Sequence, residues 1–461
     1  MRLADLTRNR LWVLQSKLRD GRCEKYDRLT ELQWQDRESA RALQRTKLED
    51  LLTHAHTHVP YYGEILTGYG VVSDDGRVDL DRFEAVPVLD KSTLKDNFEA
   101  LKSDDLDERD WYRNSTGGST GEPAAFLQDT NYSEWRIGAD LLYDDWAGYT
   151  TGEPRIKLWG SERDVFDVNE SLQKRVGKEL RNETWLNGFM MSSEDMHSYV
   201  ETINAVKPTN ILAYAECIYE LAKFVDEHSM DVYSPDSILS SAGTLYPNMR
   251  ETIESAFDAP VFNRYGSREM GDIACECPAH EGLHVCAPTH YVEILNDDGE
   301  PVEPGELGEI VVTSLENYAM PLIRYRIGDM AVKTDDVCSC GRGWPLLAEI
   351  TGRVTDVFRK ADGTVVSPEY FIHAVGVVVD APWLSKFQVV QTEYDRIEMS
   401  LVDANDATDP LETYRDELAD LTAKIRLVMG DDCEVTYEFV DEIAPTDSGK
   451  YRYTISKVAD D

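Results

Sequence analysis

Three short apolar segments that run into small residues most constrain the fold of this chain. They are Arg155–Gly160, Ile238–Gly243 and Val261–Gly266, and each has the length and composition of a buried strand. Helical patterns over 193–206 and 216–227 lie between them. Alternating strands and helices predict parallel α/β layers. Ligands of such sheets bind beyond the carboxyl ends of the strands, where the small residues lie.

The patterns divide the chain into a large N-terminal domain, 1–351, and a small C-terminal domain, 352–461. The first begins with helices that end at Val59-Pro60, and over about 285–350 it changes to short alternating strands, which predict a β-rich subdomain. We therefore expect the α/β class, with layered sheets, a β-rich subdomain and a small α+β domain. The elements expected in the small domain are strands at 365–366, 387–391, 397–402 and 434–440, a helix after 367–369 and a second helix over 410–429.

Acidic residues dominate the charge of the chain. Asp and Glu total 87 against 47 Lys and Arg, a net charge of -40, yet they are spread through a chain that is 42% hydrophobic. This distribution is typical of a folded protein rather than a disordered acidic tail. Such a surface stays hydrated in concentrated salt, so we hypothesise a halophilic source. It also argues against nucleic acid and anionic membranes as partners.

No segment is long and apolar enough for a membrane span or a signal peptide, so we expect a cytoplasmic location. Eight cysteines in such a chain favour a metal over disulfides. Cys338 and Cys340 could bind zinc with a Cys and a His from the segment 275–284. The alternative is a set of small buried thiols.

Histidines 54, 56 and 58 also suggest a metal site at first sight. Alternate residues diverge on a helix, however, and this segment has helical spacing. We therefore interpret His54, His56 and His58 as histidines that face solvent near a helix end.

The segment Asn114–Pro123 combines three glycines with four hydroxyl side chains. Glycine allows a tight turn whose N–H groups approach an anion, and the hydroxyls can bind phosphate oxygens. It is not the phosphate loop of the NTPases, because no Gly-Lys-Ser/Thr closes it. The alternative is a flexible Ser/Gly linker.

Four further segments carry groups that suit a nucleotide. Tyr265–Glu269 offers an aromatic ring and a carboxylate, and Arg324–Asp329 ends in an acid that can accept two ribose hydroxyls. Gly352–Asp356 supplies a guanidinium for phosphate, and Thr446–Lys450 places a lone lysine on a turn.

In this order the five segments resemble the adenylate-forming superfamily of acyl-CoA synthetases, luciferases and peptide-synthetase adenylation domains. Three more segments are similar to its phenylacetate-CoA ligase-like branch, which includes CapK-type proteins and synthetases that adenylylate a deazaflavin coenzyme. These are Leu43–Leu48, Val59–Tyr62 and Cys338–Arg342.

The resemblance implies a role for each nucleotide segment. The loop would hold the β- and γ-phosphates of ATP, Tyr265 would stack on adenine, Asp329 would bind the ribose, and Ala242 with Gly243 would line the adenine or acyl pocket. The implied nucleotide-binding residues are Ser115, Thr116, Gly117, Gly118, Ser119, Thr120, Gly121, Ala242, Gly243, Tyr265, Gly266, Ser267 and Asp329.

It also implies the catalytic residues and a mobile C-terminal lid. Glu269 would bind magnesium, Arg353 the ribose or a phosphate, and Lys450 the α-phosphate and the carboxylate oxygen. The lid would rotate between the two half-reactions. Two positions depart from the family: Glu122 replaces the usual lysine of the loop, and Thr355 precedes Asp356 at the hinge, which leaves the pivot residue open.

For the metal, the resemblance favours a structural zinc ion on Cys277, His284, Cys338 and Cys340. Cys275 and His280 are the substitutes.

The expected function is an ATP-dependent acid:CoA ligase that uses ATP, magnesium and CoA and forms an acyl-adenylate. One alternative is an adenylyltransferase that attaches AMP to a hydroxyl-bearing coenzyme. Another is a non-catalytic or carrier-loading CapK-like protein of a biosynthetic cluster. The acid is unspecified, with an aromatic acid among the options, and a homodimer stays open. Aromatic side chains that line either the acid pocket or the core are Trp159, Trp185, Phe189 and Tyr214.

Overall fold

The computed structural model forms two compact units. The first contains Met1–Ser115, Ala124–Glu153 and Phe262–Gly352, and the second Thr116–Pro123, Pro154–Val261 and Arg353–Asp461. Residues 154–261 fall in the same unit as 353–461. The expected boundary between residues 351 and 352 stays a prediction. The structure describes residues 3–19, 21–73, 75–115, 124–160, 180–296, 298–350, 358–366, 370–371, 383–405, 407–443 and 454–458.

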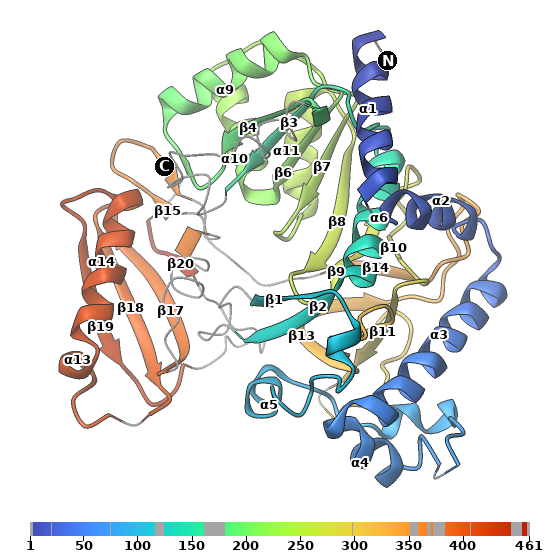
Figure 1. The fold of residues 1–461 in the computed structure, drawn as a ribbon. Helices are drawn as coiled ribbons and strands as arrows, with labels where there is room; N and C mark the ends of the chain where they lie inside the picture. The colour runs from blue at the N-terminus through green and yellow to red at the C-terminus, as the bar shows by residue number, and fades with distance from the viewer. Residues whose placement is uncertain are drawn as a thin grey trace. The chain divides into compact units, whose positions relative to one another are not determined.

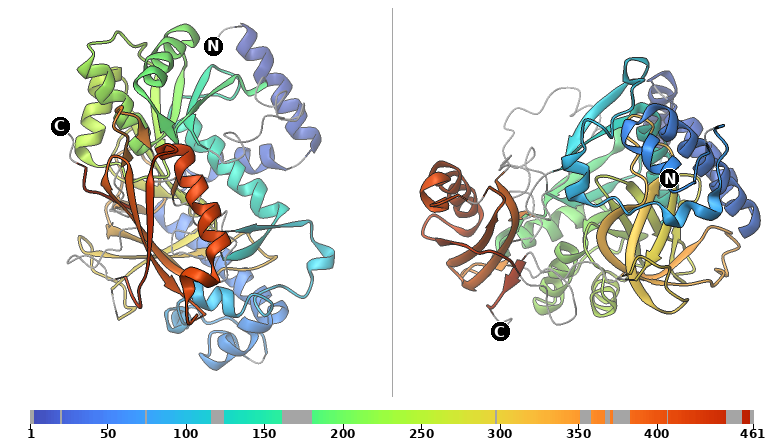
Figure 2. Two further views of the ribbon diagram at one scale, coloured as in Figure 1. Left: turned by 90° about the vertical axis from the view of Figure 1, so that its left-hand side faces the viewer. Right: turned by 90° about the horizontal axis from the view of Figure 1, so that it is seen from below.

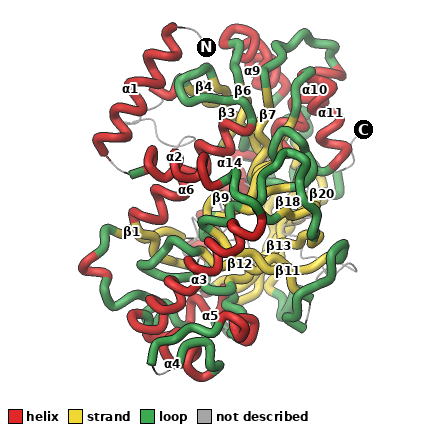
Figure 3. The backbone as a smooth tube through the Cα atoms, turned by 90° about the vertical axis from the view of Figure 1, so that its right-hand side faces the viewer, coloured by secondary structure: helices red, strands yellow, loops and turns green. Residues whose placement is uncertain are grey.

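Helices make up the N-terminal part of the first unit. They are α1 (Leu3–Arg19), α2 (Arg22–Leu32), α3 (Arg37–His58), α4 (Pro60–Gly68) and α5 (Lys91–Asp96). Asp36 caps α3, because its side chain accepts a hydrogen bond from the N–H of Ser39. Helix α3 ends at His58, close to the predicted stop, and Pro60 begins α4 directly after it. Figure 3 shows α3 and α4 next to each other. A proline suits the first turn of a helix, where its missing N–H is not needed.

Antiparallel strands form a large part of the first unit. The strands are β8 (Val261–Ser267), β9 (Gly271–Glu276), β10 (Leu283–Val285), β11 (His290–Leu295), β12 (Leu307–Ser314), β13 (Tyr325–Lys333) and β14 (Leu346–Ile350). Their order is β11-β12-β13-β14-β10-β9-β8. The β-rich region therefore begins before residue 285, because β8 pairs with β9 as an antiparallel hairpin.

A separate hairpin, β1 (Trp111–Ser115) and β2 (Ala125–Asp129), leads into α6 (Thr130–Trp146). Asp129 caps this helix through the N–H of Tyr132. Apolar side chains of α3, the hairpin and β13 share one core, which includes Leu52, Phe126 and Tyr325. Burying these large side chains is the main favourable contribution to the stability of the unit.

A parallel sheet in the second unit confirms the α/β expectation. Its order is β7-β6-β3-β4, and the pairs β3–β4, β3–β6 and β6–β7 are parallel. Helices α9, α10 and α11 lie beside it (Figure 1). The bounds are β3 (Arg155–Trp159), β4 (Glu183–Asn187), α9 (Ser193–Val206), β6 (Asn210–Tyr214), α10 (Ala215–Glu227), β7 (Ser237–Ser241) and α11 (Pro247–Phe257). A capping box of Ser192 and Asp195 begins α9 at the predicted residue.

The C-terminal residues of the second unit form a smaller α+β arrangement. Its sheet order is β19-β18-β17-β20, and α14 lies along one face (Figure 2). The bounds are β17 (Leu384–Glu393), β18 (Arg396–Asp403), α13 (Pro410–Thr413), α14 (Arg415–Met429), β19 (Glu434–Phe439) and β20 (Thr454–Ser456). The single helix expected over 410–429 is thus two helices that meet at Tyr414.

Contacts that join this C-terminal part to the rest of its unit include a strand pairing and an ion pair. Strand β16 (Val365–Val366) pairs with β5 (Met190–Met191) and with β15 (Phe358–Arg359). Arg359 Nη2 lies 2.7 Å from Glu220 Oε2 on α10. Within the described ranges, no helix combines the length and apolar character needed to cross a membrane.

Arg324 and Glu293 form a buried ion pair in the first unit, with side chains only 3% and 6% exposed. The guanidinium donates from Nε at 3.1 Å and from Nη2 at 2.9 Å to the two carboxylate oxygens. Arg324 has a positive φ of 51°, so side-chain contacts hold the backbone of this residue in a strained conformation.

We expect Arg324→Met to lower the free energy of unfolding by about 3–5 kcal/mol, because it leaves a buried carboxylate without its partner. Glu293→Leu with Arg324→Met should recover much of that loss in urea unfolding measurements. The control is Arg326→Met, which breaks the more exposed pair with Glu309 and should cost at most about 1 kcal/mol. Equal losses in the single and double variants would contradict this account.

Candidate functional site

The end of β8 and the tight turn that joins it to β9 carry several of the residues predicted to bind a nucleotide. The N–H of Met270 donates to Ser267 Oγ at 3.1 Å, which closes the turn. A Cβ at Gly266 would lie 2.3 Å from the carbonyl oxygen of Gly271, so only glycine fits there. The sequence Tyr265-Gly266-Ser267 therefore reflects the close approach of two backbone segments.

Side chains from other elements hold this turn in place. Gln128, on β2 and only 2% exposed, donates from Nε2 to the carbonyl oxygens of Arg268 at 3.0 Å and Glu269 at 3.2 Å. His290 Nε2 lies 2.7 Å from the carbonyl oxygen of Met270. Burial lowers the pKa of His290 to about 4, so its imidazole is neutral and donates through that N–H at neutral pH.

The carboxylate of Glu269 has its own partner. Tyr325, at the start of β13, donates its hydroxyl to Glu269 Oε1 at 3.2 Å. Asp329, farther along β13, accepts at Oδ2 a hydrogen bond of 2.9 Å from the hydroxyl of Tyr265. Strand β13 thus contacts both ends of the segment Tyr265–Glu269.

Ser115, the first residue of the predicted phosphate loop, is linked to the same turn. It ends β1 and pairs with Ala125. The side chain of its neighbour Asn114 accepts at Oδ1 a hydrogen bond of 2.9 Å from the N–H of Ser115. The same side chain donates from Nδ2 to Gln128 Oε1 at 3.1 Å. Gln128 therefore bonds simultaneously to the strand that enters the loop and to the turn that carries Glu269.

The structure brings together part of the predicted set. Ser115, Tyr265, Gly266, Ser267, Glu269 and Asp329 lie in the first unit, joined by the contacts above. Ala242 and Gly243 lie in the second unit. The remaining predicted residues lie outside the described residues: Thr116, Gly117, Gly118, Ser119, Thr120, Gly121, Arg353 and Lys450.

At Gly243 a Cβ would lie 2.3 Å from a carboxylate oxygen of Glu216, so a larger residue would require that side chain to move. Ala242 has a positive φ of 61°. The position after β7 is therefore a tightly packed, strained bend beside a carboxylate that is 7% exposed.

Sequence reasoning missed Gln128 and Tyr325. Gln128 is a polar residue that follows the apolar run Ala124–Leu127, and that contrast was the available signal. Tyr325 lies inside the segment Arg324–Asp329, of which only Asp329 was predicted to bind the nucleotide. Neither position could be assigned a partner without the fold.

The four aromatic residues considered for an acid pocket all lie in the second unit. Trp159 stacks on Tyr214 with 4.1 Å between ring centroids, and the Tyr214 hydroxyl donates to the carbonyl of Gly160 at 3.0 Å. Phe189 belongs to the core of that unit, while Trp185 lies under Lys157. These contacts serve packing, and they leave an additional role in substrate binding open.

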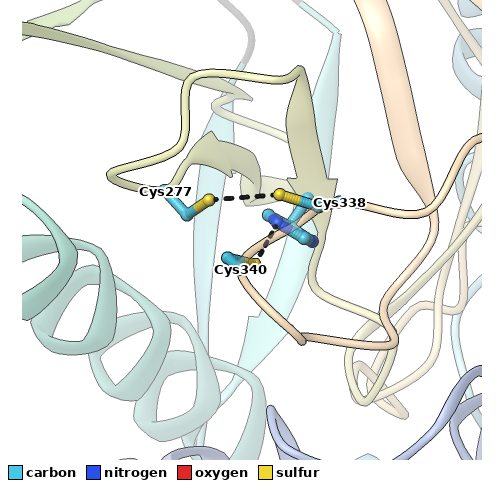
Figure 4. A group of neighbouring side chains, drawn as sticks. Cys277, Cys338 and Cys340 are labelled. Carbon is cyan, nitrogen blue, oxygen red and sulfur yellow. Dashed lines mark hydrogen bonds between the residues drawn. The ribbon is translucent and has the colours of Figure 1, made fainter.

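A second site gathers Cys277, His284, Cys338 and Cys340. Their ligand atoms all lie within 4.8 Å of one another. The sulfur atoms of Cys277 and Cys338 are 3.6 Å apart, and Cys340 Sγ lies 3.4 Å from His284 Nε2 (Figure 4). Cys277 follows β9, His284 lies on β10, and the other two cysteines precede β14.

The chemistry of this cluster fits a soft divalent cation. Burial raises the pKa of Cys277, and it raises the pKa of Cys338 to about 12. Burial opposes ionisation of Cys340 too, but hydrogen bonds from Arg342 and the other two thiols lower its pKa. Burial and the charge of Arg342 lower the pKa of His284 to about 4, so the imidazole is neutral. Three sulfurs and one neutral imidazole are a common ligand set for structural zinc.

The two substitutes named for this site lie elsewhere. Cys275 is fully buried on β9, and His280 Nδ1 lies 3.1 Å from Glu276 Oε2. Neither belongs to the group of four that the structure assembles.

His54, His58 and Asp105 form another close group. The histidine side chains are partly exposed, that of His58 by 38%, and burial lowers the pKa of His54. Protein groups already occupy the ligand atoms: His58 Nδ1 contacts Asp104 at 2.8 Å, and Asp105 binds Arg109 through bonds of 2.8 and 2.6 Å. The guanidinium beside this group disfavours a bound cation.

Comparisons with known proteins agree with the predicted relationship. Residues 358–457 match the CapK C-terminal domain. Protein CapK of Staphylococcus aureus is 22% identical over 425 residues, which cover 90% of this chain and 89% of CapK. A phenylacetate-coenzyme A ligase of Thermus thermophilus is 25% identical over 340 residues, which cover 71% of this chain and 73% of the ligase.

Among solved structures, 2-hydroxyisobutyryl-CoA ligase in complex with 2-HIB-AMP and CoA superposes with a TM-score of 0.58. The identity is 20%, and the match covers 91% of this chain and 90% of that one, so the likeness establishes the fold. The chain is therefore a homologue of CapK and of the phenylacetate-coenzyme A ligases, and it has the fold of the adenylate-forming ligases.

Proposed function

We propose that this protein activates a carboxylic acid with ATP and transfers the acyl group to CoA. The observation that carries the proposal is the convergence of Ser115, Tyr265–Glu269 and Asp329 in one unit through hydrogen bonds. An aromatic ring, two carboxylates and the entry to a glycine-rich loop are the groups that an adenine, a ribose, a divalent cation and a triphosphate require. The names of the relatives, acid:CoA ligases among them, support the same reaction class.

In the first half-reaction a carboxylate oxygen of the acid attacks the α-phosphorus of ATP. The bond from that phosphorus to the bridging oxygen breaks, and pyrophosphate leaves. In this proposal Tyr265 stacks on adenine, Asp329 accepts the ribose hydroxyls, and the loop from Ser115 to Gly121 holds the β- and γ-phosphates. Ala242 and Gly243 belong to the adenine or acyl pocket.

The residues of this step must also offset the repulsion between a carboxylate and a triphosphate. Magnesium, when bound, supplies positive charge to the phosphate oxygens, and Glu269 is its proposed ligand. Lys450 serves as a compact cation for the α-phosphate and the attacking oxygen. Arg353 binds the ribose or a phosphate.

In the second half-reaction the thiol sulfur of CoA attacks the acyl carbon. The bond from that carbon to the phosphate oxygen breaks, AMP leaves, and the thiol proton is released to solvent. We propose that the C-terminal residues rotate between the steps and remove Lys450 from the phosphate. The pivot is Thr355 or Asp356.

The proposal also covers a zinc site, the source of the protein, its partners and its location in the cell. Cys277, His284, Cys338 and Cys340 would hold zinc as a closed, structural set. Because the net charge is -40, we retain the halophilic source and expect neither nucleic acid nor anionic membrane as partner. A cytoplasmic location suits ATP and CoA as substrates, and a homodimer stays open.

Pyrophosphate release tests the activity directly. We expect release with some members of a panel of aryl, fatty and small acids, in molar and in dilute salt, and a thioester when CoA is added. Lys450→Ala should reduce the rate by about 10²- to 10³-fold with little change in ATP binding, because it removes one charge contact of the transition state.

The matched control for this test is Lys457→Ala, which removes an exposed lysine near the same chain end. Release at the original rate in the Lys450 variant would contradict its assigned role. A stable AMP conjugate formed without CoA would instead favour an adenylyltransferase.

Metal analysis of the purified protein tests the second site. We expect about one zinc per chain, and Cys277→Ser should abolish stoichiometric zinc and lower the thermal midpoint, because the ligand set loses one of four members. Cys286→Ser, which alters a buried cysteine outside the group, should keep its zinc. A wild-type protein purified without zinc, and unaffected by added zinc, would contradict the proposal.

A further inference from the structure

We infer that Gln128 is a positioning residue that couples the phosphate loop to the magnesium-binding turn. The inference rests on the proposed function, since it concerns how that nucleotide site is assembled. Gln128 lies on β2, outside the five segments that bear the nucleotide-binding side chains. Its amide nevertheless contacts two of these segments.

The first end of the link is the turn that carries Glu269. Gln128 Nε2 donates to the carbonyl oxygens of two successive residues, Arg268 at 3.0 Å and Glu269 at 3.2 Å. Two acceptors on adjacent peptide groups fix the orientation of the backbone on both sides of the Glu269 Cα. The direction in which the carboxylate projects therefore depends on this amide.

The second end is the strand that enters the loop. Gln128 pairs with Tyr112 across the hairpin, and its Oε1 accepts from Asn114 two residues farther along β1. Such diagonal contacts lie within reach of long side chains on an antiparallel pair. Asn114 in turn accepts the N–H of Ser115, so the link reaches the first residue of the loop.

Burial makes the link costly to replace. Gln128 is 2% exposed, and a polar group at such a position destabilises the protein unless it is hydrogen-bonded. A methionine would fill nearly the same volume, but it would leave the carbonyls of Arg268 and Glu269 without this donor. The turn would then lose its fixed position while the core stayed filled. Partners that orient a metal ligand typically affect metal affinity or activity by about 10- to 100-fold.

The test measures binding of ATP alone, without acid or CoA, as a function of magnesium concentration. We expect Gln128→Met to raise the magnesium concentration for half-maximal ATP binding by about tenfold or more. Asn114→Ala, at a half-buried position, should raise this magnesium concentration by a smaller factor. This variant tests the inference if Gln128→Met does not fold. Isothermal titration calorimetry and the thermal midpoint are recorded for each protein.

Gln33→Met is the matched control. Gln33 is also a buried glutamine of the first unit that donates to a backbone carbonyl, that of Thr30 at 3.0 Å. If Gln128 had a purely structural role, Gln128→Met would lower the thermal midpoint as the control does and leave the magnesium dependence of ATP binding unchanged. That result would overturn the inference. Wild-type protein that binds no MgATP would overturn both the inference and the proposed function. Wild-type protein that binds MgATP but activates no acid would overturn the function alone.

Discussion

The hydrogen bonds that hold the turn between β8 and β9 are the constraint on which the candidate site depends. Gln128 lies 140 residues before Arg268 in the sequence, and Tyr265 lies 64 residues before Asp329, yet each pair is in direct contact. Because these partners come from β2 and β13, the turn takes its shape only when the strands of the first unit have formed. The site is thus a product of tertiary structure, since no local segment contains it.

Strands β9, β10 and β14 of the first unit connect the turn to the group of Cys277, His284, Cys338 and Cys340. Strand β9 begins at Gly271, at the end of the turn, and runs to Glu276, directly before Cys277. His284 follows on β10, which pairs with both β9 and β14. A closed metal site after β9 would tie the end of this strand, whose start adjoins the turn with Glu269, to β10 and to the segment before β14. Its contribution to the enzyme would then be stability of the framework, with no part in the chemistry.

The sequence patterns predicted elements with strong local signals. Helix α9 begins and ends at the expected residues because a capping box and helical periodicity agree there, and β3 and β7 are short strands in two of the expected segments. The pairing of β8 with β9 was missed, because apolar runs do not reveal which neighbour a strand will pair with. Gln128 and Tyr325 were missed for a related reason: their importance lies in distant partners, and the residue types alone carry no such information. The spacing of the cysteine pairs pointed to a metal site, and the resemblance to the phenylacetate-CoA ligase-like branch selected Cys277, His284, Cys338 and Cys340 as its ligands.

The central claim is that separate segments of the first unit bind one nucleotide together. Hydrogen exchange measured by mass spectrometry with and without MgATP tests it most directly. The account predicts slower exchange, at the same nucleotide concentration, in peptides that cover 111–129, 265–271 and 325–329, while the peptide over 196–206 on α9 is unchanged. Protection of only one of the three segments, or of none, would contradict it.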